Sequence, residues 1–436
     1  MLLAKMQIFL DITRIYARSW RVSPTGIDRV EWAYAQHLKS HDKLNLVFTL
    51  PMASGQLTAQ RSGELLEQIR LSWGEMPKAT EDPIFLAIGT WLRQSVNLQT
   101  TATIRLRPPK RSTPNIRSLG APLGDLLRGS KVLTRTLGHS SGEKRCYINV
   151  SHLQIEHPVR LQWTQKNDVP VTLMLHDTIP IDYPEFCRPG SAEQHKARLR
   201  GAAQMRARLI LNSNTTRDRV LHNFQLLGLP VPDMLVAPLG LDERFAPSAK
   251  IAAPTADTPY FVCVGTIEPR KNLTFLLEVW RRLVERHGTR TPRLVLVGHR
   301  GWENENIIDI LERARQIAPF VAEISGLTDA GLASLMAGAS AVLAPSLVEG
   351  YSLPCLEALA CGAPVLASDI AVHREVCGDH AELIDVVDGP GWISAIEHMS
   401  GVDDPLTKRL QAQAAKFMPM RWQAHINSVT DFIAQD

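Results

Sequence analysis

The sequence predicts a two-domain protein of the doubly wound α/β class, in which two Rossmann-like halves face a central cleft. The chain has 436 residues, more than one hydrophobic core usually organises. Short apolar runs alternate with amphipathic stretches from end to end, which is the pattern of buried parallel strands separated by helices. A stretch rich in Pro, Ala and Thr near the middle divides this series in two.

The expected strands are short apolar runs, and amphipathic stretches such as 273–286 and 329–337 supply helices between them. These runs are 7–11, 44–50, 84–88, 171–175, 209–211, 234–237, 260–264, 294–297, 342–344 and 364–367.

The same patterns give the expected domain limits. We expect an N-terminal domain over 1–245, a linker over 246–258 and a C-terminal domain over 259–418. Pro419 should end one helix, and a last helix over 419–436 could return to the first domain.

Composition excludes several classes of protein. Apolar residues make up 44% and charged residues 21%, as in an ordinary globular enzyme, and a net charge of +4 gives no reason to expect nucleic acid. The six cysteines form no Cys-x-x-Cys pair, so we expect reduced, buried thiols. No apolar run approaches the roughly 18–20 residues that span a bilayer. We therefore expect a soluble or peripheral protein.

One segment, about 101–145, is an expected basic insertion. It holds ten Lys/Arg against two acidic residues, and its apolar residues recur at roughly helical spacing. Three interpretations remain open: contact with an anionic membrane, contact with an acidic acceptor, or a solvated insertion.

The strongest local pattern is the turn 264–272. An apolar strand ends in Gly265 and a helix should begin near Asn272, so unpaired N–H groups are offered to an anion. Arg270 and Lys271 add a planar fork of donors and a point charge, which suits a diphosphate. A solvent-facing basic turn is the alternative.

The second pattern runs from Glu349 to Glu357. A strand precedes it, Gly350 allows close approach, and Pro354 is placed to open a helix that Gly362 ends. A carboxylate on the loop and another one turn inside the helix could both accept hydroxyl groups. By itself, a pair of glutamates eight apart is a weak signal.

Together these stretches make the C-terminal half resemble the retaining nucleotide-sugar glycosyltransferases of family 4, which have the GT-B fold. The resemblance rests on the glutamate pair Glu349 and Glu357, on "GTIEPRKN" at 265–272, on "LVLVGHRGW" at 294–302, and on the long run 324–369.

The resemblance implies a donor site, residue by residue. Arg270 and Lys271 would bind the diphosphate, Glu349 the transferred sugar and Glu357 the ribose. Further donor-binding positions would be Gly26, Asp177, Gly265, Thr266, Gly298, Leu327, Gly350, Tyr351, Ser352 and Leu353. Within this set, Gly298 and Leu327 would lie by the base, and the backbone of 351–353 by the phosphates.

The N-terminal half contributes two further turns. Gly26 fits a glycine turn that approaches donor phosphate and acceptor, and Arg29 could add charge there for the acceptor. "HDTIP" at 176–180 resembles a subset of the family that includes mannosyltransferases of polysaccharide and O-antigen assembly. His176 would then face the outer hydroxyls of the sugar, whereas His152 is a weaker acceptor candidate.

The resemblance implies retaining, metal-independent hexosyl transfer, with mannose from GDP-mannose as the donor and no cofactor. We further expect a lipid-linked or oligosaccharide acceptor and a role in surface polysaccharide synthesis. The expected location is the cytoplasm, with peripheral contact at the inner membrane face as an option. An epimerase of the same fold and a catalytically silent sugar-nucleotide-binding partner are the alternatives.

Overall fold

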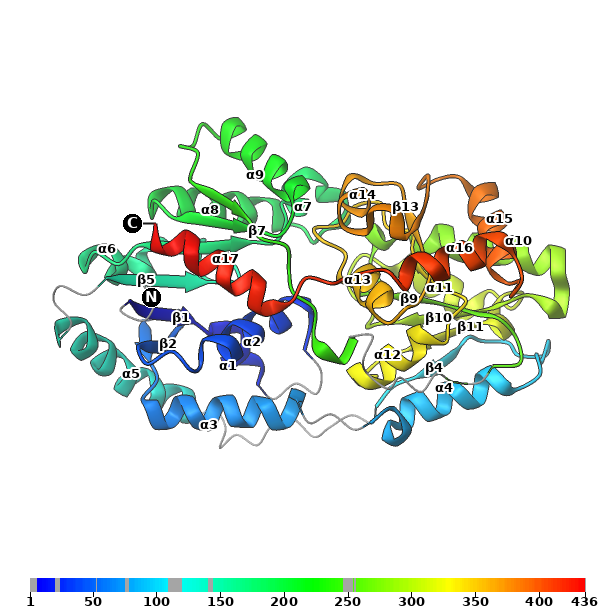
Figure 1. The fold of residues 1–436 in the computed structure, drawn as a ribbon, viewed down its shortest axis with the longest axis horizontal. Helices are drawn as coiled ribbons and strands as arrows, with labels where there is room; N and C mark the ends of the chain where they lie inside the picture. The colour runs from blue at the N-terminus through cyan, green and yellow to red at the C-terminus, as the bar shows by residue number, and fades with distance from the viewer. Residues whose placement is uncertain are drawn as a thin grey trace.

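The computed structural model describes residues 6–19, 24–51, 53–74, 78–108, 120–139, 144–245, 254 and 256–435. It consists of two lobes side by side, each built around a sheet with helices on both faces (Figure 1). Among the described residues, the sheet orders are β3-β2-β1-β5-β6-β7-β8 and β14-β13-β12-β9-β10-β11-β4. All the pairings in both sheets are parallel except that of β2 with β3, which confirms the expected doubly wound α/β class.

The strands of the N-terminal sheet are short and mostly buried, as expected for strands covered on both faces. They are β1 (Gln7–Asp11), β2 (Leu44–Thr49), β3 (Ser54–Gln56), β5 (Arg145–Asn149), β6 (Val171–Leu175), β7 (Arg208–Leu211) and β8 (Met234–Val236). The helices in this half of the chain are α1 (Thr13–Arg18), α2 (Gly26–Leu38), α3 (Ala59–Ile69), α5 (Gly120–His139), α6 (Gln162–Lys166), α7 (Ile179–Asp182), α8 (Ser191–Gln204) and α9 (Asn214–Leu226).

The second lobe repeats the plan. Its strands are β9 (Tyr260–Val264), β10 (Arg293–Val297), β11 (Val321–Ile324), β12 (Ala341–Ala344), β13 (Val365–Ser368), β14 (Glu382–Ile384) and β4 (Ile104–Leu106). Its helices are α10 (Leu273–His287), α11 (Glu305–Arg313), α12 (Asp329–Ala337), α13 (Leu353–Ala360), α14 (Ala371–Cys377), α15 (Gly389–Met399), α16 (Pro405–Ala414) and α4 (Pro83–Arg93).

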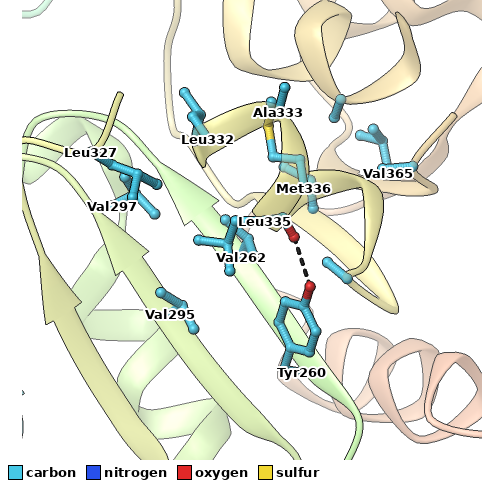
Figure 2. Close-up of a cluster of buried hydrophobic side chains, with 14 of the residues drawn as sticks. Tyr260, Val262, Val295, Val297, Leu327, Leu332, Ala333, Leu335, Met336 and Val365 are labelled. Carbon is cyan, nitrogen blue, oxygen red and sulfur yellow. Dashed lines mark hydrogen bonds between the residues drawn. The ribbon is translucent and has the colours of Figure 1, made fainter. Parts of the chain in front are cut away.

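One of the two buried clusters of the second lobe lies between the sheet and the helices α12 and α13, and the other includes α10 and α15. Figure 2 shows Val262 and Val295 of neighbouring strands facing Leu335 and Met336 of α12. The Tyr260 hydroxyl donates to the Leu335 carbonyl at 2.8 Å, so the one polar group of this side chain is satisfied inside the core. Packing of this kind fixes the strand ends that carry the site described below.

The segment 78–108 lies in the second lobe, which corrects two expectations. The run 84–88 belongs to helix α4, because Asp82 caps its N-terminus and Pro83 occupies its first position. The short strand β4 pairs with β11, so this part of the expected N-terminal domain 1–245 completes the C-terminal sheet instead (Figure 1). A purely local pattern cannot reveal this, since the partner strand lies more than 200 residues away along the chain.

Asp82 joins this segment to helix α12, and we expect its removal to be costly. One carboxylate oxygen accepts from the backbone N–H groups of Ile84 and Phe85, and the other from Thr328 at 2.7 Å. Asp82→Ala removes a helix cap and leaves a partly buried N–H unpaired, so it should lower the free energy of unfolding by about 2 kcal/mol or more.

Urea unfolding of the full chain measures this effect. Thr58→Ala is the matched control, because Thr58 caps α3 at an exposed site and bonds only to its own helix, at Arg61. Equal losses in the two variants would mean that the bond to Thr328 contributes nothing.

The chain returns to the first lobe at its end. Helix α17 (Trp422–Ala434) packs against α2 (Figure 1), the Tyr34 hydroxyl lies 2.7 Å from His425 Nε2, and Arg208 donates to the carbonyls of Phe432 and Ile433. The expected return of the last helix is therefore seen. Most of the expected linker, 246–253 and 255, lies outside the described residues.

The expected basic insertion divides into different environments. Residues 104–106 form β4, while α5 packs Leu133 and Leu137 into the first lobe and exposes Arg128, Lys131 and Arg135. Lys110, Arg111, Arg117 and the other residues of 109–119 and 140–143 lie outside the described residues. No helix in the described ranges is both long and apolar enough to cross a bilayer.

Candidate active site

The loops that follow the strands of both sheets face each other between the lobes. A cavity of about 240 Å³ lies there, with Asp177, Tyr183 and Arg219 of the first lobe on one side and Glu349 and Val372 of the second on the other. This placement at the carboxyl ends of parallel strands is where doubly wound sheets bind ligands.

Arg270, Lys271 and Glu349 converge on one point. The chain leaves β9 through a short 3₁₀ turn, Pro269–Lys271, and Asn272 at φ 55° redirects it into α10. Arg270 Nη1 lies 2.5 Å from Glu349 Oε2, and the Lys271 ammonium pairs with the other carboxylate oxygen. The turn at 270 and the loop at 349 therefore form a single cluster.

Glu349 is ionised in this cluster. Burial alone would raise the pKa of its carboxyl, but the charges of Arg270 and Lys271 outweigh burial and hold the pKa below its ordinary value. Ser346 donates a further hydrogen bond to the same carboxylate at 2.8 Å, and Glu268 pairs with Arg270 at 2.7 Å. Two cations beside a cleft, held by carboxylates, could hold a diphosphate.

The next loops surround this cluster. The Gly265 N–H donates to Val297 and the Gly298 N–H to Ile324, so the ends of β9, β10 and β11 lie tightly together next to Thr266. Leu327 is buried in the loop after β11. The base-binding roles of Gly298 and Leu327 stay predictions, as does the donor role of Thr266.

The loop before α13 carries the remaining donor candidates. Ser352 has φ 68° and directs its hydroxyl to His373 Nε2, 3.0 Å away, while Tyr351 reaches the Leu239 carbonyl at 3.4 Å. Leu353 approaches Gly26, since a Cβ built on Gly26 would lie 3.6 Å from its side chain. The loop thus touches both lobes.

Gly350 lies where the backbones of the two lobes come close together. A side-chain carbon at this position would lie 2.7 Å from the His176 carbonyl oxygen and 3.0 Å from Asp177 Cβ. Only glycine leaves room for the "HDTIP" turn to reach the loop that carries Glu349. The fold therefore places His176 and Asp177 beside Gly350.

Glu357 lies one turn inside α13 and pairs with the first lobe. Arg29 Nη1 lies 2.6 Å from its carboxylate, and Arg29 also pairs with Asp329 of α12. The Arg29 guanidinium is therefore bound by two carboxylates of the second lobe, and its expected contact with an acceptor stays a prediction.

His176 and His152 are buried neighbours with ring centres 4.7 Å apart. Burial lowers the pKa of both imidazoles, so both are neutral near pH 7. His176 Nε2 lies 2.7 Å from the Val150 carbonyl, which assigns the proton to Nε2 and leaves Nδ1 as an acceptor for a hydroxyl group. Their proposed roles toward sugar and acceptor remain predictions.

Several residues that contact the site were not predicted from the sequence. Ser346, Asp329 and His373 contact Glu349, Arg29 and Ser352, respectively. Asp329 had a signal, since it opens a helix just after the expected base-binding residue Leu327. Ser346 and His373 had none, because each is an ordinary residue until the fold brings it next to a partner. Within the described residues, no His/Cys/Asp/Glu cluster could hold a metal ion.

The fold and a part of the sequence match known proteins. Sucrose-phosphate synthase from Thermosynechococcus elongatus has a TM-score of 0.60 at 15% identity, covering 99% of this chain and 98% of that one. Anabaena HepE, solved in complex with UDP, has a TM-score of 0.59 at 14% identity, covering 99% and 100%. At such identities these likenesses show the fold alone, which is GT-B.

The sequence comparisons match parts of the chain. Residues 258–400 match the model described as "Glycosyl transferases group 1". O-antigen chain mannosyltransferase B of Escherichia coli is 36% identical over 162 residues, which are 36% of this chain and 42% of that protein. The MMP alpha-(1->4)-mannosyltransferase of Mycolicibacterium hassiacum is 31% identical over 182 residues, 40% of each chain.

The two Rossmann-like lobes have the GT-B fold of these solved structures. Residues 258–400 thus match the glycosyl transferases group 1 model, and part of the chain is similar to a bacterial O-antigen mannosyltransferase. The chain spans less than half of the length of the curated relatives named here.

Proposed function

We propose that this protein is a retaining hexosyltransferase that moves mannose from GDP-mannose onto a lipid-linked or oligosaccharide acceptor in surface polysaccharide synthesis. The observation that carries the proposal is the convergence of Arg270, Lys271 and Glu349 at the carboxyl ends of the C-terminal strands. The mannosyltransferases among the relatives support the choice of sugar.

In the proposed reaction the bond from the sugar's anomeric carbon to the diphosphate breaks, and a bond to the acceptor oxygen forms on the same face. The proton of the acceptor hydroxyl passes to the leaving phosphate oxygen. Arg270 and Lys271 would stabilise the charge that develops on this leaving group, and N–H groups at the start of α13 would add to it. We assign no general base and expect no requirement for a metal.

Glu349 must change partners when the donor binds. In the structure its carboxylate neutralises both cations, whereas a diphosphate would compete for them. Glu349 would then be free to accept hydroxyl groups of the sugar, beside His176 and Asp177 across the cleft. Closure of the lobes around the donor would exclude water and limit hydrolysis.

The exposed basic residues of α5 suit an acceptor that is bound to an anionic membrane. Arg128, Lys131 and Arg135 lie on the exposed side of the helix, while Leu133 and Leu137 anchor its other side in the first lobe. Such a surface would place the protein at the inner face of the plasma membrane.

A thermal-shift panel of GDP, UDP and their sugars tests the choice of base. A ligand at 100 times its Kd adds about 2.7 kcal/mol of stability, which is several degrees for a domain of this size. We expect GDP and GDP-mannose to raise the melting temperature and UDP to have little effect. A shift with UDP alone would contradict the GDP-mannose assignment and leave the glycosyltransferase class standing.

A transfer assay with labelled GDP-mannose then tests the reaction. Membrane extracts supply lipid-linked acceptors, and product analysis separates transfer from epimerisation, which would alter the donor sugar without an acceptor. If nucleotide binds but neither transfer nor hydrolysis of the donor occurs, the enzymatic proposal is wrong.

A further inference from the structure

Arg29 joins the two lobes at Glu357, the proposed ribose ligand. It lies on α2 of the first lobe and pairs with Glu357 of α13 and Asp329 of α12. The side chains of both acids are buried, at 6% and 3% exposure, and that of Arg29 is 22% exposed. Ion pairs this sheltered from solvent depend strongly on each partner.

Phe245, Arg244 and Asp242 surround the Arg29 ion pairs and restrict the guanidinium. Its carbon lies 5.7 Å from the centre of the Phe245 ring, and Arg244 pairs with Asp329 at 3.2 Å and with Asp242 at 2.6 Å. Asp242, Arg244 and Phe245 belong to the segment that leaves the first lobe. Helix α2 of the first lobe, helices α12 and α13 of the second lobe, and the connection between the lobes therefore all contact one another around Arg29.

Arg29 acts on the charge of Glu357. Burial raises the pKa of the Glu357 carboxyl, the positive charge of Arg29 opposes this effect, and Asp329 and Asp242 add to the rise. Arg29 and Arg244 therefore lower the pKa of Glu357, whereas Asp329 and Asp242 raise it. Removing Arg29 therefore raises the pKa of the Glu357 carboxyl and favours its protonated form.

We propose that Arg29 is a positioning residue that keeps the Glu357 carboxylate ionised and in place for the ribose hydroxyls of the donor, and so makes nucleotide binding depend on contact between the two lobes. This role rests on the proposed function, which makes Glu357 the ribose ligand. It differs from the acceptor contact that the sequence suggested for Arg29.

The test is the pH dependence of nucleotide binding by Arg29→Met, with GDP and UDP as probes. A carboxylate accepts two hydroxyl groups, whereas a protonated acid is a poorer acceptor, so binding is lost as pH falls through the pKa of Glu357. Removing Arg29 raises that pKa and moves the loss to higher pH. We expect binding by Arg29→Met to be at least about tenfold weaker than wild type at the acid end of the profile, corresponding to about one pKa unit, and to recover as pH rises.

Matched variants separate this role from a structural one. Arg29→Lys keeps the charge and should restore most of the wild-type pH profile. Glu357→Gln cannot ionise, so adding Arg29→Met to it should produce no further pH dependence. Arg14→Met is the control, since Arg14 pairs with Asp28 inside the first lobe and should leave the profile unchanged.

Two results would overturn the proposal: Arg29→Met with the wild-type pH profile, or the same added pH dependence in the Glu357→Gln background. Chemical unfolding of the same variants between about pH 6 and pH 9 reports on the ion pair without any nucleotide. If the wild type binds neither GDP nor UDP, the proposed function fails. The unfolding data still decide whether Arg29 controls the ionisation of Glu357.

Discussion

Replacing Lys271 or Arg270 by alanine should lower turnover about 100-fold or more, as does the loss of one preorganised donor from an oxyanion site. Both side chains bind the Glu349 carboxylate, and a diphosphate held there would lose one of its two proposed cationic ligands in either variant. The expected loss falls mainly on turnover, because the leaving group gains its charge in the transition state.

Each variant should still fold. Glu349 is held by two cations, so removing one leaves the other in place, and the buried carboxylate keeps a partner. Steady-state kinetics with the donor identified by the thermal-shift panel measure the effect, with circular dichroism as the check on folding. Arg282→Ala is the control, since Arg282 is a largely exposed cation of the following helix. Near-normal turnover in both variants would remove the pair from the mechanism.

Gly298→Ala should destabilise the second lobe and weaken donor binding together. A Cβ at this position would lie 1.8 Å from the Gly265 carbonyl oxygen, far inside van der Waals contact, and the obstacle is backbone rather than a movable side chain. The loops after β9 and β10 would have to separate. Overpacking of this kind costs about 1–3 kcal/mol and sometimes more.

Because the loop at 265 leads into the turn that holds Lys271, the displacement should also move the proposed diphosphate ligands. Urea unfolding and nucleotide titration of the same preparation measure both effects. Gly63→Ala is the matched control: Gly63 lies in the exposed part of α3 with no atom within 4 Å of an added Cβ, so this change should stabilise by about 0.5–1 kcal/mol. Gly298→Ala with unaltered stability and binding would mean that the two loops are not locked together.

The sequence alone was sufficient for the fold class and for singling out the basic turn with Arg270 and Lys271, for an identifiable reason. Strands such as 260–264 are continuous apolar runs, and Gly, Arg and Lys follow one of them in a local pattern that carries its own chemistry. The edge strand β4 could not be found in this way, because a three-residue strand has too little pattern and gains its partner from the far half of the chain.

The pairing of Arg29 was missed for a related reason. Glu357 and Asp329 lie about 300 residues from Arg29, and a single arginine after a glycine turn is equally compatible with a surface position. Which charges meet across the cleft is decided by how the two lobes pack, and this is tertiary information. His176 shows the same limit, because its orientation toward Val150 depends on the loop after β5.

The packing of residues 78–108 in the second lobe has a consequence for synthesis on the ribosome. Helix α4 and strand β4 emerge early, yet the strand that β4 pairs with, β11, is translated more than 200 residues later. Until then the buried face of α4, with Phe85, Ile88 and Leu92, has no native surface to cover it. The apolar face of this helix therefore stays without its native partners until β11 has been synthesised. Contacts between segments so distant in sequence also form slowly. A fragment that starts at the central connection would lack both elements, so the second lobe cannot be completed from its own half of the gene.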